Sequence, residues 1–227
     1  MKMESLVIFD FDDTIVDNSK LDYMGFKIPC QRLDINFPTK SELIIYRKKG
    51  MIAKEIIQIF SNDKIKINKF LKLRKDFLKN ESFNYLKVKP YSNFVFQKLK
   101  KNNELIISTA NNNPKMINKF LKGNNLNQYF KKVFSINDLG IELENNNFSN
   151  RILIKTSLLK LIIKNYKYSI KYIIFIGNSL EDYYAAKKCK IQFIYFINPY
   201  LPNPKIKNLK KVTKMKQIPN LIMSERN

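Results

Sequence analysis

The feature that most constrains the fold of this chain is a short apolar segment that recurs along it and is followed each time by polar residues. The segments cover residues 6–9, 105–107, 172–176 and 193–196. Runs of this length and composition are typical of strands that are buried on both faces of a parallel sheet. Polar residues stand just behind them, such as Asp10 after the first run and Asn178 close behind the third.

Helix-like patterns separate these runs. They cover residues 93–101, 114–121, 156–164 and 181–188, with Pro114 at a first-turn position where proline is tolerated. Because strand and helix alternate in this way, we predict an α/β fold with a right-handed, doubly wound parallel sheet.

Residues 18–86 interrupt the alternation. They contain no convincing apolar strand, and their apolar residues recur at spacings of three and four over 42–46, 53–60 and 67–78. We therefore predict a smaller α-helical cap domain of residues 18–86, inserted into an α/β core of residues 1–17 and 87–227. Residues 143–150 are predicted to form a polar loop, and the tail beyond Tyr200 is predicted to form turns and a loosely held end.

The composition excludes several kinds of chemistry. The 227 residues include no His, no Trp and only two Cys, and 44% of them are hydrophobic, which is enough for a real core. Without His, a Ser-His-Asp triad, an imidazole proton shuttle and an ordinary zinc site are all excluded. Any acid–base catalysis must therefore be carried out by carboxylates, Lys, Tyr or metal-bound water.

The chain is strongly basic, with 42 Lys and Arg against 19 Asp and Glu and a net charge of +23. Such a charge suits a nucleic-acid partner. The lysines are nevertheless spread through nearly every helix-like segment and accompany abundant Asn, Ile, Tyr and Phe, as expected of an AT-rich genome. We favour this compositional interpretation and keep a nucleic-acid partner as the alternative. The charge would also attract a phosphorylated small molecule to a cleft.

Several signals predict a cytoplasmic location. Cys30 and Cys189 lie too far apart in sequence to suggest a disulfide framework, and the first residues resemble neither a signal nor a transit peptide. The apolar runs are far shorter than the roughly 18 residues that a bilayer span requires. We therefore expect a reduced protein without a membrane partner, and the sequence leaves its oligomeric state open.

The polar residues behind the apolar runs are expected to meet, because ligands of open α/β sheets bind beyond the carboxyl ends of the strands. One site should then collect Asp10, Asp12, Asp13, Ser108, Asn178 and Asp182. Carboxylates at the end of a buried strand lose hydration and repel one another. A divalent cation would relieve that cost, and hard oxygen ligands at this density suit Mg²⁺.

Residues 7–18, with the sequence VIFDFDDTIVDN, resemble the first motif of the haloacid dehalogenase superfamily, which is Asp-x-Asp-x-Thr after an apolar strand. Ser108 resembles the second motif, and Lys155, just before a predicted helix, resembles the third. Residues 177–182, GNSLED, resemble the fourth, Gly-Asp-x-x-x-Asp. The resemblance spans about residues 6–200 and implies a Rossmann-like core with a helical cap that selects the substrate.

The resemblance implies a role for each catalytic candidate. Asp10 would be the nucleophile that forms an aspartyl-phosphate, and Asp12 would protonate the leaving oxygen and later deprotonate the attacking water. The Ser108 hydroxyl and the Lys155 ammonium would neutralise phosphoryl oxygens, as phosphoryl transfer demands. None of these steps needs an imidazole.

The same resemblance implies a magnesium site. Its ligands would be the side chain of Asp10, the main-chain carbonyl of Asp12, the Asn178 amide oxygen and Asp182. Asn178 departs from the family pattern, which places Asp there, so metal affinity should fall unless Asp182 or Glu181 compensates. Asp182 could instead complement the helix dipole and support the metal from behind its ligands.

Two further residues are candidates for substrate binding. Thr109 could donate to the phosphate in place of Ser108, or either residue could simply cap a turn. Arg47 belongs to a basic stretch of the insertion, 47–50, that could hold a substrate anion, although a solvated surface explains it about as well.

The function that these observations favour is a magnesium-dependent phosphatase of small phosphorylated metabolites that works through an aspartyl-phosphate. A phosphomutase would use the same Asp10 and Asp12, and a dehalogenase would attack carbon without the metal. From a different class, the alternative is a non-catalytic protein of the same fold that binds nucleic acid or another anion, and Asn178 is the feature that favours it.

Overall fold

The computed structural model describes residues 5–140, 148–166 and 168–224. The chain divides into two compact units. The first, here the α/β unit, comprises residues 1–16, 88–197 and 205–227, and the second, the helical unit, comprises residues 17–87 and 198–204.

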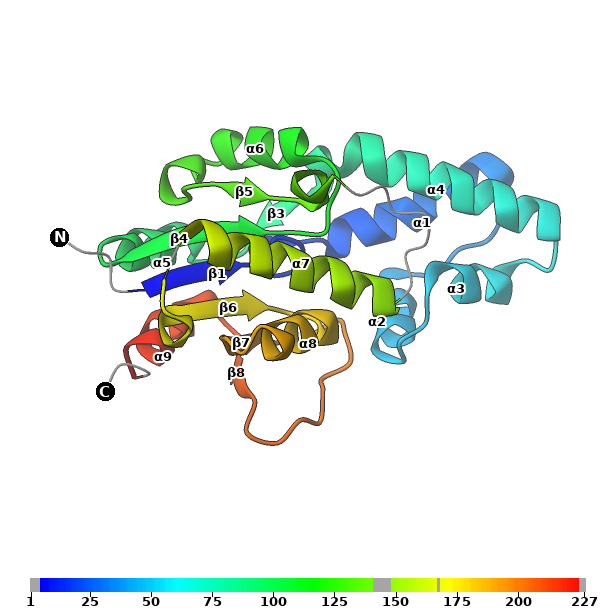
Figure 1. Cartoon of the computed structure of the whole chain (residues 1–227). Coiled ribbons are helices and arrows are strands. Elements are labelled where there is room, and N and C mark those ends of the chain that lie inside the picture. The colour runs from blue at the N-terminus through cyan, green and yellow to red at the C-terminus, as the bar shows by residue number, and fades with distance from the viewer. Residues whose placement is uncertain (1–4, 141–147, 167, 225–227) are drawn as a thin grey trace. The chain divides into compact units, whose positions relative to one another are not determined.

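The α/β unit is built on a six-stranded, fully parallel sheet in the order β5-β4-β1-β6-β7-β8 (Figure 1). Its strands are β1 (Ser5–Phe9), β4 (Asn103–Ser108), β5 (Val133–Phe134), β6 (Ile173–Gly177), β7 (Gln192–Phe196) and β8 (Lys210–Val212). Because β1 lies between β4 and β6, the first strand of the chain is in the middle of the sheet. The doubly wound α/β fold is confirmed, and all four apolar runs form strands.

Helices cover both faces of this sheet. They are α5 (Ser92–Lys100), α6 (Pro114–Gly123), α7 (Phe148–Tyr166), α8 (Leu180–Lys188) and α9 (Ile218–Ser224). Leu6 and Ile8 of β1 belong to a buried cluster with residues of α7 and α8. The alternate residue Phe9 meets the α5 residue Phe96 edge to face, with ring centroids 5.2 Å apart. Successive side chains of β1 therefore pack into two separate hydrophobic layers, one on each face of the sheet.

Two predictions for this unit need correction. Residues 143–147 of the predicted polar loop lie outside the described residues, but Phe148 to Asn150 already form the first turn of α7, so this helix starts eight residues before the predicted 156. The tail is also not loosely held over its described part. Val212 of β8 and Ile218 and Ile222 of α9 are buried, which ties the tail to the core.

The helical unit contains four helices, α1 (Ser19–Leu33), α2 (Lys40–Lys48), α3 (Ala53–Phe60) and α4 (Lys64–Tyr85). They enclose a second core in which Phe26, Ile56, Ile57 and Phe70 are buried. The three predicted helical stretches are present, and α1 is an addition. Two short strands, β2 (Val16–Asp17) and β3 (Lys87–Val88), pair where the chain enters and leaves this unit. Within the described residues, no helix combines the length and apolar character that crossing a bilayer requires.

Phe96→Ala should lower the free energy of unfolding by about 3–5 kcal/mol, because it opens a cavity where a fully buried ring packs against other aromatic side chains. The Phe96 ring contacts Phe9 and also Phe130, whose ring centroid lies 4.8 Å away. Urea denaturation measures the change. The matched control is Phe94→Ala on the same helix, where the side chain is 59% exposed and a change within about 1 kcal/mol is expected. Equal effects of the two substitutions would contradict this account of the core.

Candidate active site

The site forms where three neighbouring strands end. Asp10 follows β1 directly, Ser108 is the last residue of β4, and Gly177 is the last residue of β6. The pairing of Phe9 with Ile107 brings the Asp10 and Ser108 positions side by side. The backbone N–H of Asp10 donates to the Ile176 carbonyl at 2.8 Å, which fixes the start of the acidic loop against β6.

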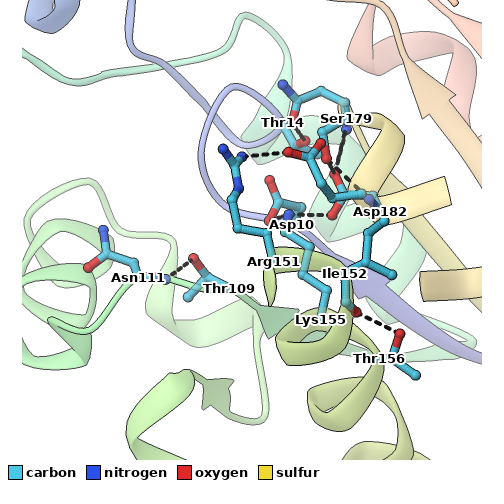
Figure 2. A network of polar contacts seen from close by, with 12 residues as sticks. Asp10, Thr14, Thr109, Asn111, Arg151, Ile152, Lys155, Thr156, Ser179 and Asp182 are labelled. Carbon is cyan, nitrogen blue, oxygen red and sulfur yellow. Dashed lines mark hydrogen bonds and ion pairs between the residues drawn. The ribbon is translucent and has the colours of Figure 1, made fainter. Parts of the chain in front are cut away.

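The centre of the site is a buried ammonium group held between two carboxylates (Figure 2). Lys155 Nζ lies 3.1 Å from Asp10 Oδ1 and also donates to Asp182 Oδ1. The Lys155 side chain is 9% exposed, that of Asp10 5% and that of Asp182 not at all. The site thus brings together residues from the β1 loop, α7 and α8. Lys155 is the eighth residue of α7 and does not stand ahead of a helix as predicted.

Asp182 has a second set of contacts through its other carboxylate oxygen. Oδ2 accepts hydrogen bonds from the backbone N–H groups of Asn178 and Ser179 and from the Ser179 hydroxyl. Ser179 in turn accepts from the Asp182 N–H, so the pair forms a capping box at the start of α8. Since both oxygens of Asp182 already accept from protein donors, its geometry favours the supporting role over that of a direct metal ligand.

The electrostatics of the cluster follow from its burial. Burial raises the pKa of Asp10 well above its usual value, and the negative charges of Asp182 and Asp12 raise it further, while Lys155 acts in the opposite direction. Burial works against the charged form of Lys155, but its attraction to Asp10 and Asp182 is stronger and raises its pKa. Lys155 is therefore a permanent cation at neutral pH.

The donor set fits a hard divalent cation. The carboxyl groups of Asp10 and Asp182 contact the Lys155 ammonium, and the charge of Asp12 also acts on Asp10, so negative charge is in excess whenever all three carboxyl groups are ionised. Asn178 Oδ1, which accepts from the Thr14 hydroxyl at 3.2 Å, adds a neutral oxygen. Over residues 5–140, 148–166 and 168–224, no three His, Cys, Asp or Glu side chains group to form a metal cage. Such a site would suit Mg²⁺, which takes few carboxylates and keeps several waters.

The two hydroxyl candidates behind β4 differ in their surroundings. Ser108 and Thr109 are both buried. The Thr109 hydroxyl oxygen accepts from the Asn111 N–H at 3.1 Å, which closes a turn, and Figure 2 shows this pair set apart from the Asp10 cluster. Ser108 directly follows Ile107, the register partner of Phe9, so its position adjoins that of Asp10 and it is the better placed of the two to meet a group bound there.

Arg47 lies in the helical unit and is held there by other residues. Its Nε and Nη2 both donate to Asp22 at 2.8 Å, and its Nη1 donates to the Met51 carbonyl at 2.8 Å. Arg74 Nη2 donates to the same Asp22 at 2.7 Å, and both guanidinium groups lie over the Phe26 ring. These contacts account for Arg47 within its own unit, and the predicted substrate contact stays a prediction.

One residue of the site was not singled out from the sequence. Arg151 stands four residues before Lys155 on α7, and its Nη2 lies 3.1 Å from Glu181 Oε1. Residues four apart share a helix face, so the spacing from Lys155 is a signal that could have found it. The predicted helix began only at residue 156, so that signal could not be used.

Gly177→Ala should displace Asp182 and lower the free energy of unfolding by about 1–3 kcal/mol, the usual cost of overpacking a core. A Cβ at position 177 would lie 2.6 Å from Asp182 Cγ and Oδ2, closer than side-chain contacts allow. Asp182 cannot move without weakening its bonds to Lys155 and Ser179. Urea denaturation tests the prediction, and an unchanged midpoint would show that the close approach is not required.

Asp22→Asn should destabilise the protein by about 1–3 kcal/mol at pH 7, since hydrogen bonds to charged groups are lost. Although burial opposes ionisation of Asp22, hydrogen bonds and charge from Arg47 and Arg74 lower its pKa. A carboxylate whose folded pKa is depressed stabilises the fold above its unfolded pKa of about 3.9. This contribution is lost as pH falls through the folded pKa. The difference between wild type and Asp22→Asn, measured by urea denaturation, should therefore shrink below about pH 4. A difference independent of pH would contradict this reading.

Comparison with known proteins places the fold. No curated protein matches this chain. Among solved structures, the chain is similar to a haloacid dehalogenase-like family hydrolase from Streptococcus pneumoniae, with 15% identity, a TM-score of 0.70, and coverage of 96% of this chain and 97% of that one. It is also similar to a haloacid dehalogenase superfamily hydrolase from Geobacter sulfurreducens, with 14% identity, a TM-score of 0.72 and coverage of 96% of both chains. A predicted phosphatase from Clostridium acetobutylicum is 16% identical, with a TM-score of 0.69 and coverage of 98% of this chain and 100% of that one.

The family model described as haloacid dehalogenase-like hydrolase matches residues 7–196, which include the β1 loop, Ser108, Lys155 and the Gly177 to Asp182 segment. These are the segments that the parallel sheet gathers at its carboxyl edge. The chain therefore belongs to the haloacid dehalogenase-like hydrolases.

Proposed function

We propose that this hydrolase is a phosphatase of small phosphate monoesters and that it works through an aspartyl-phosphate on Asp10. The observation that carries the proposal is the buried Lys155 ammonium, which contacts both Asp10 and Asp182 at the end of the central strand. A carboxylate next to a fixed cation is suited to attack phosphorus, because the cation offsets the charge of the incoming phosphoryl oxygens.

In the first step, an Asp10 oxygen attacks phosphorus, an acyl-phosphate bond forms, and the bond from phosphorus to the ester oxygen breaks. The leaving alkoxide takes a proton from Asp12. Asp12 is half-buried two residues beyond Asp10 and near enough to raise the Asp10 pKa by its charge. Its carboxyl group is thus less enclosed than the nucleophile, which supports a role in proton exchange.

In the second step, Asp12 accepts a proton from a water molecule, whose oxygen attacks the phosphorus of the aspartyl-phosphate. The bond between phosphorus and the Asp10 oxygen breaks, which releases inorganic phosphate and regenerates the carboxylate. Lys155 keeps its proton throughout, because Asp10 and Asp182 hold its pKa above the ordinary value. Its role is to position Asp10 and to neutralise charge.

We assign the metal site to Mg²⁺, with the Asp10 carboxylate, the Asp12 main-chain carbonyl and the Asn178 amide oxygen as candidate ligands. When bound, the ion would supply positive charge to the phosphoryl oxygens. Asp182 then acts as a positioning residue, since its two oxygens accept from Lys155 and from the start of α8. The excess of carboxylates over ammonium groups supports a divalent ion.

Asn178 favours one alternative, a non-catalytic protein of this fold that binds an anion. Its neutral amide removes one charge from the proposed ligand set, so an ion would be held less tightly than by a carboxylate. The contact between Asp10 and Lys155, however, is retained.

For the same protein we propose a cytoplasmic location, in keeping with two buried cysteines that form no disulfide, Cys30 and Cys189.

Hydrolysis of 4-nitrophenyl phosphate tests the proposal. Wild type should be active with Mg²⁺ and lose activity with a chelator, and Asp10→Asn should fall at least about 10³-fold because the nucleophile is gone. Lys155→Met should lose about 10²–10³-fold, the usual cost of removing a charge-stabilising donor.

The matched control is Asp76→Asn, which removes the same charge from an exposed position of α4, a helix that contributes no residue to the Asp10 cluster. Activity of this variant should stay within about threefold of wild type. Equal background rates for wild type and Asp10→Asn, with and without Mg²⁺, would overturn the phosphatase proposal and favour the anion-binding alternative.

A further inference from the structure

We propose that Arg151 is a specificity-determining residue whose guanidinium binds an anionic group on the leaving-group side of the substrate, for which a carboxylate is the smallest case. The inference rests on the proposed function, because it takes the phosphoryl group to sit at Asp10. It concerns the organic part of the ester.

The position of Arg151 follows from the helix that carries Lys155. The two residues are four apart on α7, so they share one face of the helix and their Cα atoms are separated by about 6 Å along its axis. Helix α7 precedes β6 and begins at the carboxyl edge of the parallel sheet (Figure 1). Arg151 is therefore nearer to the mouth of the site than Lys155, and Figure 2 shows its side chain beside the Asp10 cluster.

Side-chain exposure increases from Asp10 through Lys155 to Arg151. The Asp10 side chain is 5% exposed and that of Lys155 9%, whereas that of Arg151 is 43% exposed. A phosphoryl group bound at Asp10 is buried, so the organic part of a monoester must point toward solvent. The next cation toward the start of α7 on this face is Arg151, about one helical turn from Lys155.

Glu181 holds the guanidinium in place without using all of its donors. Its Oε1 lies 3.1 Å from Arg151 Nη2, and its side chain is 11% exposed. It stands next to Asp182 in the first turn of α8, so its position depends on the same helix start. A guanidinium has five N–H donors in a rigid fork. One carboxylate can orient this fork while the remaining donors face the ligand.

The competing explanation is that the Arg151–Glu181 pair only links α7 to α8. The two explanations differ in what they predict for Glu181→Gln, which weakens the link but keeps the guanidinium. They also differ in whether the loss of Arg151 affects a charged ester more than a neutral ester of the same shape.

The test measures equilibrium binding by calorimetry to Asp10→Asn, which cannot turn the ligand over, with Mg²⁺ present. The ligands are 2-phospholactate and isopropyl phosphate, which differ only in a carboxylate in place of a methyl group. In the Asp10→Asn background, Arg151→Gln should weaken the binding of 2-phospholactate about tenfold or more, which is the loss expected for a charge-assisted hydrogen bond. The same substitution should weaken the binding of isopropyl phosphate less than about threefold. Glu181→Gln should keep most of the preference for the charged ester.

Lys164→Gln, at an exposed position near the other end of α7, removes an equal charge and controls for the general basicity of the chain. Equal losses for both esters in Arg151→Gln, or no preference for the charged ester before substitution, would overturn the inference. An Arg151-dependent preference in a protein whose wild type shows no hydrolysis would support the contact between Arg151 and the carboxylate and reject the phosphatase proposal, so the two failures are distinguishable.

Discussion

The arrangement of the site depends on one buried ammonium group. A lysine that is withdrawn from water is costly unless its charge is paired, and Lys155 is paired twice, with Asp10 and with Asp182. These three residues come from α7, the loop after β1 and the first turn of α8. Removal of Lys155 would leave two buried carboxylates without a cation, whereas removal of either carboxylate would leave Lys155 paired with the other. The cluster therefore contributes less to net stability than to fixing where three elements of the core meet.

The sequence is sufficient for the central part of the fold and insufficient for its edges. The central strands are continuous apolar runs because both of their faces are covered, and such runs are visible without a structure. The edge strand β5 has two residues and β8 contributes only Val212 to the interior, so neither has a pattern to detect. In α1, Gly25 and Pro29 look like helix breakers. Gly25 instead allows α1 to pack closely on α4, since a Cβ there would lie 3.3 Å from the Leu78 side chain.

The candidate site, like the fold, could be predicted from the sequence only in part. Asp10 and Asn178 could be placed because they stand behind strands that end at one edge of the sheet. Lys155 could be assigned to the site only through the family resemblance, because the chain has many lysines, and its direct contact with Asp10, 145 positions away, could not be predicted. The contacts of Asp182 with the start of α8 are local, but they compete with metal binding for the same oxygens. Only the three-dimensional contacts decide between the two roles.

Asn178 can be understood from the charge balance of the site. The carboxyl groups of Asp10, Asp12 and Asp182 already exceed the single ammonium of Lys155, and the raised Asp10 pKa is the consequence of crowding such groups away from water. An aspartate at position 178 would stand beside the same carboxylates and raise the Asp10 pKa further when no cation is bound. The amide of Asn178 keeps an oxygen at this position, fixed by the Thr14 hydroxyl, without adding that repulsion. In the proposed enzyme, weaker attraction for Mg²⁺ is thus accompanied by a nucleophile that is easier to keep ionised.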